Sequence, residues 1–192
     1  MDTLLEAFAS LARSDSYLQL LVIGGGANFV SSIGFKGDYT AYLHSLAKEL
    51  GIADRVTWTG YCSTWEPTAS MYLRASDVCV LPYDTGVSLN KTSVATALAH
   101  GLPLITTRGP FSDPEFVDGK NVLFCPPKDA NALAMAIERL LSSQESRGKL
   151  SEGARELYEE RFSWDRVVEQ TLKVYAGAKA STSLRETAEV SE

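Results

Sequence analysis

Residues 78–107 read VCVLPYDTGVSLNKTSVATALAHGLPLITT, and this stretch decides the fold class. The apolar run at residues 78–81 is typical of a buried strand, and a second apolar run follows a Gly-Leu-Pro turn. Between the two runs, the pattern predicts a helix at about residues 90–100. A strand, a helix and a second strand in this order indicate a parallel βαβ unit.

The loop between that first strand and the helix is a candidate ligand site. In an open parallel sheet, ligands bind in the crevice beyond the carboxyl ends of the strands. Gly86 would let the backbone approach a ligand closely. Ser88 and Asn90 are both candidate N-caps, and the free amide groups after them suit an anion. The residues of this stretch that suit a phosphate-bearing ligand are Gly86, Val87, Ser88, Lys91 and Thr92. The alternative is an ordinary capped helix behind a surface loop.

Composition excludes several classes of protein. The 192 residues are 45% hydrophobic and 22% charged, which is ordinary for one globular domain. A net charge of -6 argues against nucleic acid as the partner, because such proteins need a basic face. Three scattered cysteines predict neither a metal site nor a disulfide framework, and so indicate a reducing, cytoplasmic setting. The chain has no apolar run of transmembrane length and no signal-peptide pattern.

The rest of the chain alternates strand and helix patterns. Predicted helices lie at residues 2–11, 38–50, 66–75, 129–141 and 144–161 and from Ser163 onward, and further strands at 18–23, 55–59 and 122–125. We therefore predict an α/β fold with a doubly wound parallel sheet sandwiched by helices. The domain is expected to span residues 1–176. Residues 177–192 are small, polar and charged, and we expect them to form a disordered tail.

A second candidate ligand-facing turn is Gly24-Gly25-Gly26, directly after the strand at residues 18–23. Glycines after a strand are typical of dinucleotide-binding turns, but this is not the full fingerprint. Phe29 stands where the third glycine of that motif belongs. Gly24, Gly25 and Gly26 therefore remain candidates for ligand contact, with a plain turn as the alternative.

Taken together, the segments resemble a known family. They are DTLLEAFASL, LQLLVIGGG, LAKELGIADRVTWTGY, ASDVCVLPY, TALAHGLPLITT, PEFVDGKNVLF, DANALAMAIERLL and FSWDRVVEQTLKVY. In this order they resemble the C-terminal, donor-binding domain of GT-B glycosyltransferases, in particular family 4 of the retaining enzymes (glycosyl transferases group 1). The resemblance covers nearly everything up to Tyr175. It implies a Rossmann-like half of a GT-B fold that binds a nucleoside-diphosphate sugar as substrate, with no cofactor and no metal.

The resemblance also implies roles for individual residues. The base would pack beside the turn after the strand at residues 55–59, near Gly60, Tyr61 and Cys62. The diphosphate would lie at the start of the helix at residues 90–100, with Lys91 as its cation. For Lys91 the alternative is a solvated surface lysine.

The first of two departures from the family pattern concerns the donor site. The family usually carries two glutamates separated by seven residues, and Ser88 and Thr96 occupy those positions here. Both can form hydrogen bonds, but neither is a carboxylate. Thr96 could contact a ribose hydroxyl or could be an ordinary helix residue, and the sequence leaves both open.

The other departure is at the front of the chain, which resembles the family only after its first strand and its Arg/Lys loop. The resemblance implies a separate N-terminal acceptor domain, which this chain lacks, and leaves open a membrane association through that domain. We therefore expect a fragment that is inactive alone and that self-associates through its uncovered sheet edge and apolar faces. No catalytic residue is assigned, and His44 and His100 are expected to be structural.

The expected function is thus the donor-binding half of a retaining, hexosyltransferase-type enzyme. It would transfer a sugar from a nucleoside diphosphate to an acceptor. Two alternatives remain open at this point. One is a non-catalytic module that binds a nucleotide or a protein partner, which the two missing glutamates would suit. The other is a different GT-B-type enzyme, such as a nucleotide-sugar epimerase.

Overall fold

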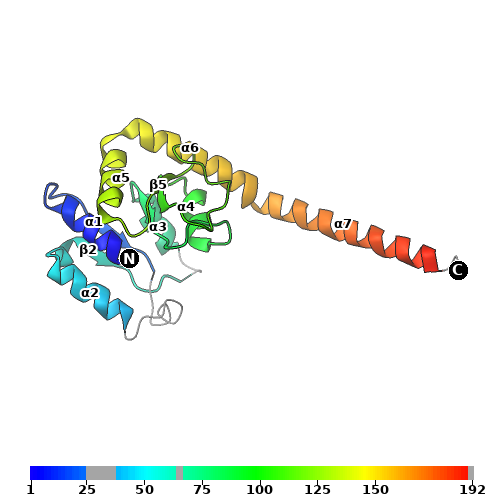
Figure 1. Cartoon of the computed structure of the whole chain (residues 1–192), viewed down its shortest axis with the longest axis horizontal. Coiled ribbons are helices and arrows are strands. Elements are labelled where there is room, and N and C mark those ends of the chain that lie inside the picture. Colours follow the sequence, from blue (N-terminus) through cyan, green and yellow to red (C-terminus); the bar gives the residue numbers. More distant parts are fainter. Residues whose placement is uncertain (25–37, 64–66, 190–192) are drawn as a thin grey trace.

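The computed structural model describes residues 1–24, 38–63 and 67–189 of the chain, with side chains described as far as Gly177. The helices are α1 (Asp2–Ala12), α2 (Tyr39–Glu49), α3 (Thr68–Arg74), α4 (Thr92–Ala99), α5 (Ala130–Ser142), α6 (Gln144–Arg161) and α7 (Trp164–Glu189), with a short 3₁₀ turn at Ala53–Arg55. The strands are β1 (Leu20–Val22), β2 (Val56–Trp58), β3 (Cys79–Leu81), β4 (Leu104–Thr107) and β5 (Leu123–Cys125). Figure 1 shows the strands covered by helices, with α7 running away from them.

All strand pairs are parallel, and helices flank them, so the predicted α/β class is confirmed. Among the described residues the strands form two sheets, β1-β2 and β3-β4-β5, where the sequence predicts a single doubly wound sheet. No strand in the described part of the chain pairs with the outer edge of β1 or β3. Both of these strands are consequently half-buried, whereas every residue of the central strand β4 is buried.

The sheet β3-β4-β5 is packed on both faces because side chains alternate along a strand. On one face, Val80 and Ile105 join an apolar cluster with residues of α1 and α5. On the other face, Leu81, Leu104 and Phe124 join a second cluster with α4 and α6. This two-sided burial is the helix-sheet-helix sandwich that the sequence predicts, and it fixes the position of α4 beside the end of β3.

Helix α1 holds the two sheets in one body. Its Leu4 and Ala7 belong to the cluster beneath β3-β4-β5. Its Leu5 and Phe8 belong to a third cluster, which α2 and Val56 of β2 complete. Because α1 is apolar on both of these sides, the chain packs β1-β2 and β3-β4-β5 against the same helix.

Helix α7 continues to Glu189, through residues for which the sequence predicts a disordered tail. Residues 178–189 contain no proline or glycine and include several alanines, so their backbone propensity permits the helix to extend. In its first half α7 exposes a set of apolar side chains that we call the α7 face: Trp164, Val167, Val168, Leu172, Val174 and Tyr175. None of the helices in the described residues is long and apolar enough to cross a membrane.

Candidate functional site

Two loops meet beyond the carboxyl ends of β3 and β4. The β3–α4 loop comprises residues 82–91, and the β4–β5 loop comprises residues 108–122. The amide of Phe111 donates to the carbonyl of Thr85 at 3.1 Å, and the amide of Asp113 donates to the carbonyl of Val87 at 3.0 Å. The Asp113 carboxylate in turn accepts a hydrogen bond from the amide of Leu89 at 2.7 Å. Hydrogen bonds to the β4–β5 loop therefore set the shape of the β3–α4 loop.

The structure gives its own reason for a glycine at position 86, beyond the ligand approach that the sequence suggests. Its φ is +99°, a region that favours glycine. A Cβ at this position would lie 2.4 Å from the Ser112 hydroxyl and 2.9 Å from the Gly109 amide nitrogen. A Cβ at Gly109 would likewise meet the Thr85 carbonyl carbon at 2.4 Å. The close approach at Gly86 is thus to the neighbouring loop, and contact of its backbone with a ligand stays a prediction.

The start of α4 also differs in detail from the prediction. Lys91 is the N-cap, and no side chain caps the helix. The two candidate caps, Ser88 and Asn90, do not cap the helix. Their side chains contact each other instead, since the Ser88 hydroxyl donates to the Asn90 side-chain oxygen at 2.6 Å. The amides of Val94 and Ala95 both reach the Lys91 carbonyl, at 3.0 and 3.1 Å.

Two amide groups are consequently left at this helix start. Those of Thr92 and Ser93 are the first in α4 and have no intrahelical acceptor. Uncapped amides at the positive end of the helix dipole are suited to an anion. The start of α4 therefore offers the chemistry of a phosphate site.

Tyr83 lies beside this helix start, and the sequence reasoning assigned it no role. The Lys91 ammonium lies over the Tyr83 ring, 4.3 Å from the ring centroid. The Tyr83 hydroxyl shares a hydrogen bond of 2.7 Å with the Ser93 hydroxyl. Burial raises the pKa of Tyr83, although its hydrogen bond to Ser93 lowers it in part. Within the described residues Lys91 forms no ion pair with a carboxylate.

The two positions that replace the family's glutamates form local hydrogen bonds. Thr96 is exposed, and its hydroxyl donates to the Thr92 carbonyl at 2.8 Å within α4. Ser88 uses its hydroxyl as a donor to Asn90. A contact of either residue with a ligand stays a prediction, and their hydroxyl oxygens keep free lone pairs for it.

A second group of predicted residues comes together after β1 and β2. Gly24 and Gly60 form an isolated bridge, and the Gly24 amide donates to the Thr59 hydroxyl at 3.0 Å. The same hydroxyl lies 3.4 Å from the Cys62 sulfur. The Tyr61 side chain is 81% exposed, so its ring is available to stack on a base. The remaining glycines of the predicted turn, Gly25 and Gly26, lie outside the described residues.

Both histidines have structural contacts. The His100 ring lies between the Ser70 hydroxyl, 2.7 Å from Nε2, and the Thr96 carbonyl, 2.8 Å from Nδ1. The His44 ring packs against the Trp58 ring, with 4.4 Å between the centroids. In the part of the chain that the structure describes, no group of histidine, cysteine and acidic side chains could hold a metal ion.

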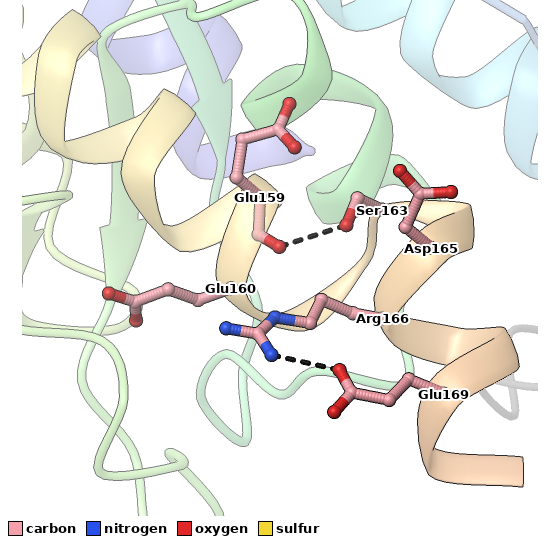
Figure 2. A pocket seen from close by; sticks show the side chains of 6 residues that line it. All are labelled: Glu159, Glu160, Ser163, Asp165, Arg166 and Glu169. Atoms are coloured by element: carbon pink, nitrogen blue, oxygen red, sulfur yellow. Dashed lines mark hydrogen bonds and ion pairs between the residues drawn. The ribbon is translucent and has the colours of Figure 1, made fainter.

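A pocket of about 450 Å³ lies elsewhere, at the junction of α6 and α7, and Figure 2 shows its lining. We call it the elbow pocket; its lining residues are Glu159, Glu160, Ser163, Asp165, Arg166 and Glu169. Its one cation, Arg166, already contacts Glu169 at 3.0 Å. The Ser163 hydroxyl donates to the Glu159 carbonyl at 2.9 Å. The excess of carboxylates would repel a diphosphate, so the elbow pocket does not compete with the start of α4 as an anion site.

Comparison with known proteins gives consistent matches. The family model for glycosyl transferases group 1 matches residues 1–157. A D-inositol 3-phosphate glycosyltransferase of Saccharomonospora viridis is 32% identical over 186 residues, which cover 94% of this chain and 40% of that protein. The chain spans about two fifths of the length of the first curated relatives it matches.

Two solved structures illustrate the shared fold. HepE of Anabaena in complex with UDP and glucose has a TM-score of 0.74 and 16% identity, covering 91% of this chain and 44% of HepE. The C-terminal domain of a glycosyl transferase group 1 family protein from Francisella tularensis has a TM-score of 0.68 and 18% identity, covering 85% of this chain and 79% of that domain.

Proposed function

Because this chain belongs to the glycosyl transferases group 1 family, we propose that it is the donor-binding half of a retaining glycosyltransferase. The family match confirms the resemblance seen in the ordered sequence segments. In the proposed reaction, a hexose-type sugar passes from a nucleoside diphosphate to an acceptor. HepE, which has a similar fold, was solved with UDP and glucose, and UDP is therefore the first nucleotide to test.

The observation that carries the proposal is the start of α4. Two amide groups without intrahelical acceptors and the Lys91 ammonium, which pairs with no carboxylate of the described residues, gather beyond the end of β3. This is the edge at which open parallel sheets bind ligands. We assign the diphosphate to Gly86, Val87, Ser88, Lys91 and Thr92, and Gly86 also shapes the loop that presents them.

This arrangement suits a departing nucleoside diphosphate. Negative charge grows on the diphosphate as its bond to the sugar breaks, and fixed donors aimed at that charge stabilise the transition state. Lys91 supplies a full positive charge, and the amides of α4 supply the partial charge of the helix dipole. In the proposal Gly60, Tyr61, Cys62 and Thr96 contact the base and ribose, and neither a metal nor a cofactor has a role.

The acceptor is proposed to bind a separate domain of the parent protein. In support, the relatives are more than twice as long as the stretch that this chain matches. The α7 face, and the outer edges of β1 and β3 that no described strand covers, are available for contact with that domain. Without it, we expect the chain to catalyse no transfer and to self-associate through those surfaces.

One observation favours a second candidate, a non-catalytic nucleotide-binding module. Ser88 and Thr96 stand where the family usually carries glutamates, and both are engaged in local hydrogen bonds. Such a module would still bind the diphosphate through α4. The two functions therefore share a ligand and differ in whether sugar transfer follows when the acceptor domain is present.

Calorimetric titration of the chain with UDP, GDP and ADP, each beside its nucleoside, tests the proposal. We expect one diphosphate to bind roughly tenfold or more tightly than its nucleoside, because the phosphates add charge-assisted contacts. The proposal fails if no diphosphate binds at millimolar concentration, or if the nucleoside binds equally well. Transfer activity of the parent protein then separates an enzyme from a binding module.

A further inference from the structure

We propose that Tyr83 is a positioning residue, which holds Lys91 and the first turn of α4 in the arrangement that receives the donor diphosphate. The inference rests on the proposed function and adds to it a residue that does not itself touch the ligand. Tyr83 contacts both sequence neighbours of Thr92, namely Lys91 and Ser93. The Thr92 amide is one of the two left without an intrahelical acceptor. The Tyr83 hydroxyl meets Ser93 at 2.7 Å, and its ring face lies 4.3 Å from the Lys91 ammonium.

The backbone of Tyr83 is anchored to the sheet. Its amide donates to the Leu81 carbonyl at 3.1 Å, at the end of β3. Its carbonyl accepts a hydrogen bond from the hydroxyl of Thr107, the last residue of β4. The ring also packs against the buried cluster that contains residues of α4 and α6. Tyr83 is thereby a rigid link from the central sheet to the start of α4.

The ring confines Lys91 without neutralising it. A carboxylate in the same place would cancel the charge that a diphosphate needs, whereas an aromatic face attracts the ammonium and leaves the charge available. The nearest acidic residue along the chain, Asp84, instead pairs with Lys128 at 3.4 Å. A free lysine loses side-chain freedom when it binds phosphate, and a lysine already held over a ring loses less. Tyr83 should therefore raise the affinity of the site for a diphosphate.

The competing explanation is that Tyr83 only packs the core beside α4. A packing residue would change the stability of the fold, and would affect ligand binding equally whether or not Lys91 is present. A positioning residue acts on diphosphate binding through Lys91. The two explanations therefore differ in whether the effects of substitutions at 83 and 91 add, which a double-mutant cycle measures.

The experiment titrates UDP, inorganic pyrophosphate and uridine into the wild type, Tyr83→Leu, Lys91→Ala and the double variant. Tyr83→Leu should weaken binding of UDP and pyrophosphate threefold to tenfold and leave uridine unchanged. In the Lys91→Ala background, the same substitution should cause less than a twofold further loss. Tyr83→Phe, which keeps the ring face and loses the hydroxyl, should restore most of the affinity.

Equal losses in both backgrounds, or no loss in Tyr83→Leu, would overturn the inference. If Lys91→Ala weakens binding and Tyr83→Leu does not, the inference fails and the proposed function stands. If the wild type binds neither UDP nor pyrophosphate, both fail. If Tyr83→Leu does not fold, the inference is tested on the wild type, by following the NMR signals of the Tyr83 ring protons. Their signals must shift as pyrophosphate is added, and unmoved signals would contradict the inference.

Discussion

The Asp113 carboxylate accepts a hydrogen bond of 2.7 Å from the amide of Leu89, and so fastens the β4–β5 loop to the β3–α4 loop. The two residues are 24 positions apart. The bond satisfies a half-buried amide two residues before the N-cap of α4. The geometry of the candidate diphosphate site thus depends on a residue outside it.

Asp113→Ala should destabilise the chain and loosen the candidate site. The Leu89 amide would lose its acceptor, and an unsatisfied amide of this kind costs about 1–3 kcal/mol. Chemical denaturation followed by circular dichroism measures the loss. Asp113→Asn keeps an acceptor oxygen without the charge and should lose less than the alanine variant. Equal stability of the wild type and Asp113→Ala would show that the bond contributes nothing.

Gly109→Ala should destabilise the fold by forcing the two loops apart. Its Cβ would lie 2.4 Å from the Thr85 carbonyl carbon, and overpacking against backbone typically costs about 1–3 kcal/mol. Gly148→Ala in α6 is the matched control, because its Cβ would meet nothing within 4 Å. It should stabilise the helix by roughly 0.5–1 kcal/mol. Urea unfolding of both variants checks the prediction, and a Gly109→Ala variant as stable as the wild type would contradict it.

Lys91→Ala should weaken binding of UDP by roughly tenfold or more, since a hydrogen bond to a charged group contributes about 1.5–3 kcal/mol. Binding of uridine, which lacks the phosphates, should stay nearly unchanged. Lys149→Ala removes the same charge from an exposed position of α6, distant in sequence from Lys91. It should change the binding of neither UDP nor uridine. Calorimetry on the three proteins is the measurement. Equal losses for UDP and uridine would mean that Lys91 acts on the fold and not on the diphosphate.

The isolated chain should self-associate through the α7 face and the sheet edges, because large exposed apolar patches promote pairing. Trp164 is 79% exposed and Leu172 is 61% exposed. Light scattering should therefore give an apparent mass that rises with protein concentration. Replacing both residues with serine should lower that mass toward the monomer. A strictly monomeric wild type at millimolar concentration would contradict the prediction.

Local sequence signals predicted most of the helices well. The predicted helix at 144–161 has the bounds of α6, whose first turn is capped by the Ser143 hydroxyl at 3.1 Å from the Ser146 amide. Asp38 and Asp129 cap α2 and α5 in the same way, at the first residues of the predicted helices. These signals succeed because a cap and the amides it satisfies lie within a few residues of each other.

What the sequence could not predict concerns contacts between distant segments and the limits of composition. The sequence could not show that Gly86 faces Gly109, or that a Cβ on Gly153 would meet the Lys120 carbonyl at 2.1 Å. That second contact, with Leu150 and Leu157, gives the highly charged helix α6 a buried side. The link from Tyr83 to Lys91 spans a loop whose shape the β4–β5 loop imposes. The tail is a different case, because its polar composition predicts disorder whereas its alanines permit a helix.

The most direct test of the central claim is a UDP titration of the ¹⁵N-labelled chain followed by NMR. The claim is that the diphosphate lies at the start of α4. Saturable shifts should then concentrate at the amides of Val87, Ser88, Thr92 and Ser93, with a second set near Gly60 from the base. Inorganic pyrophosphate should reproduce the first set without the second. Saturable shifts that leave Thr92 and Ser93 unmoved, or that cluster around another part of the chain, would contradict the claim.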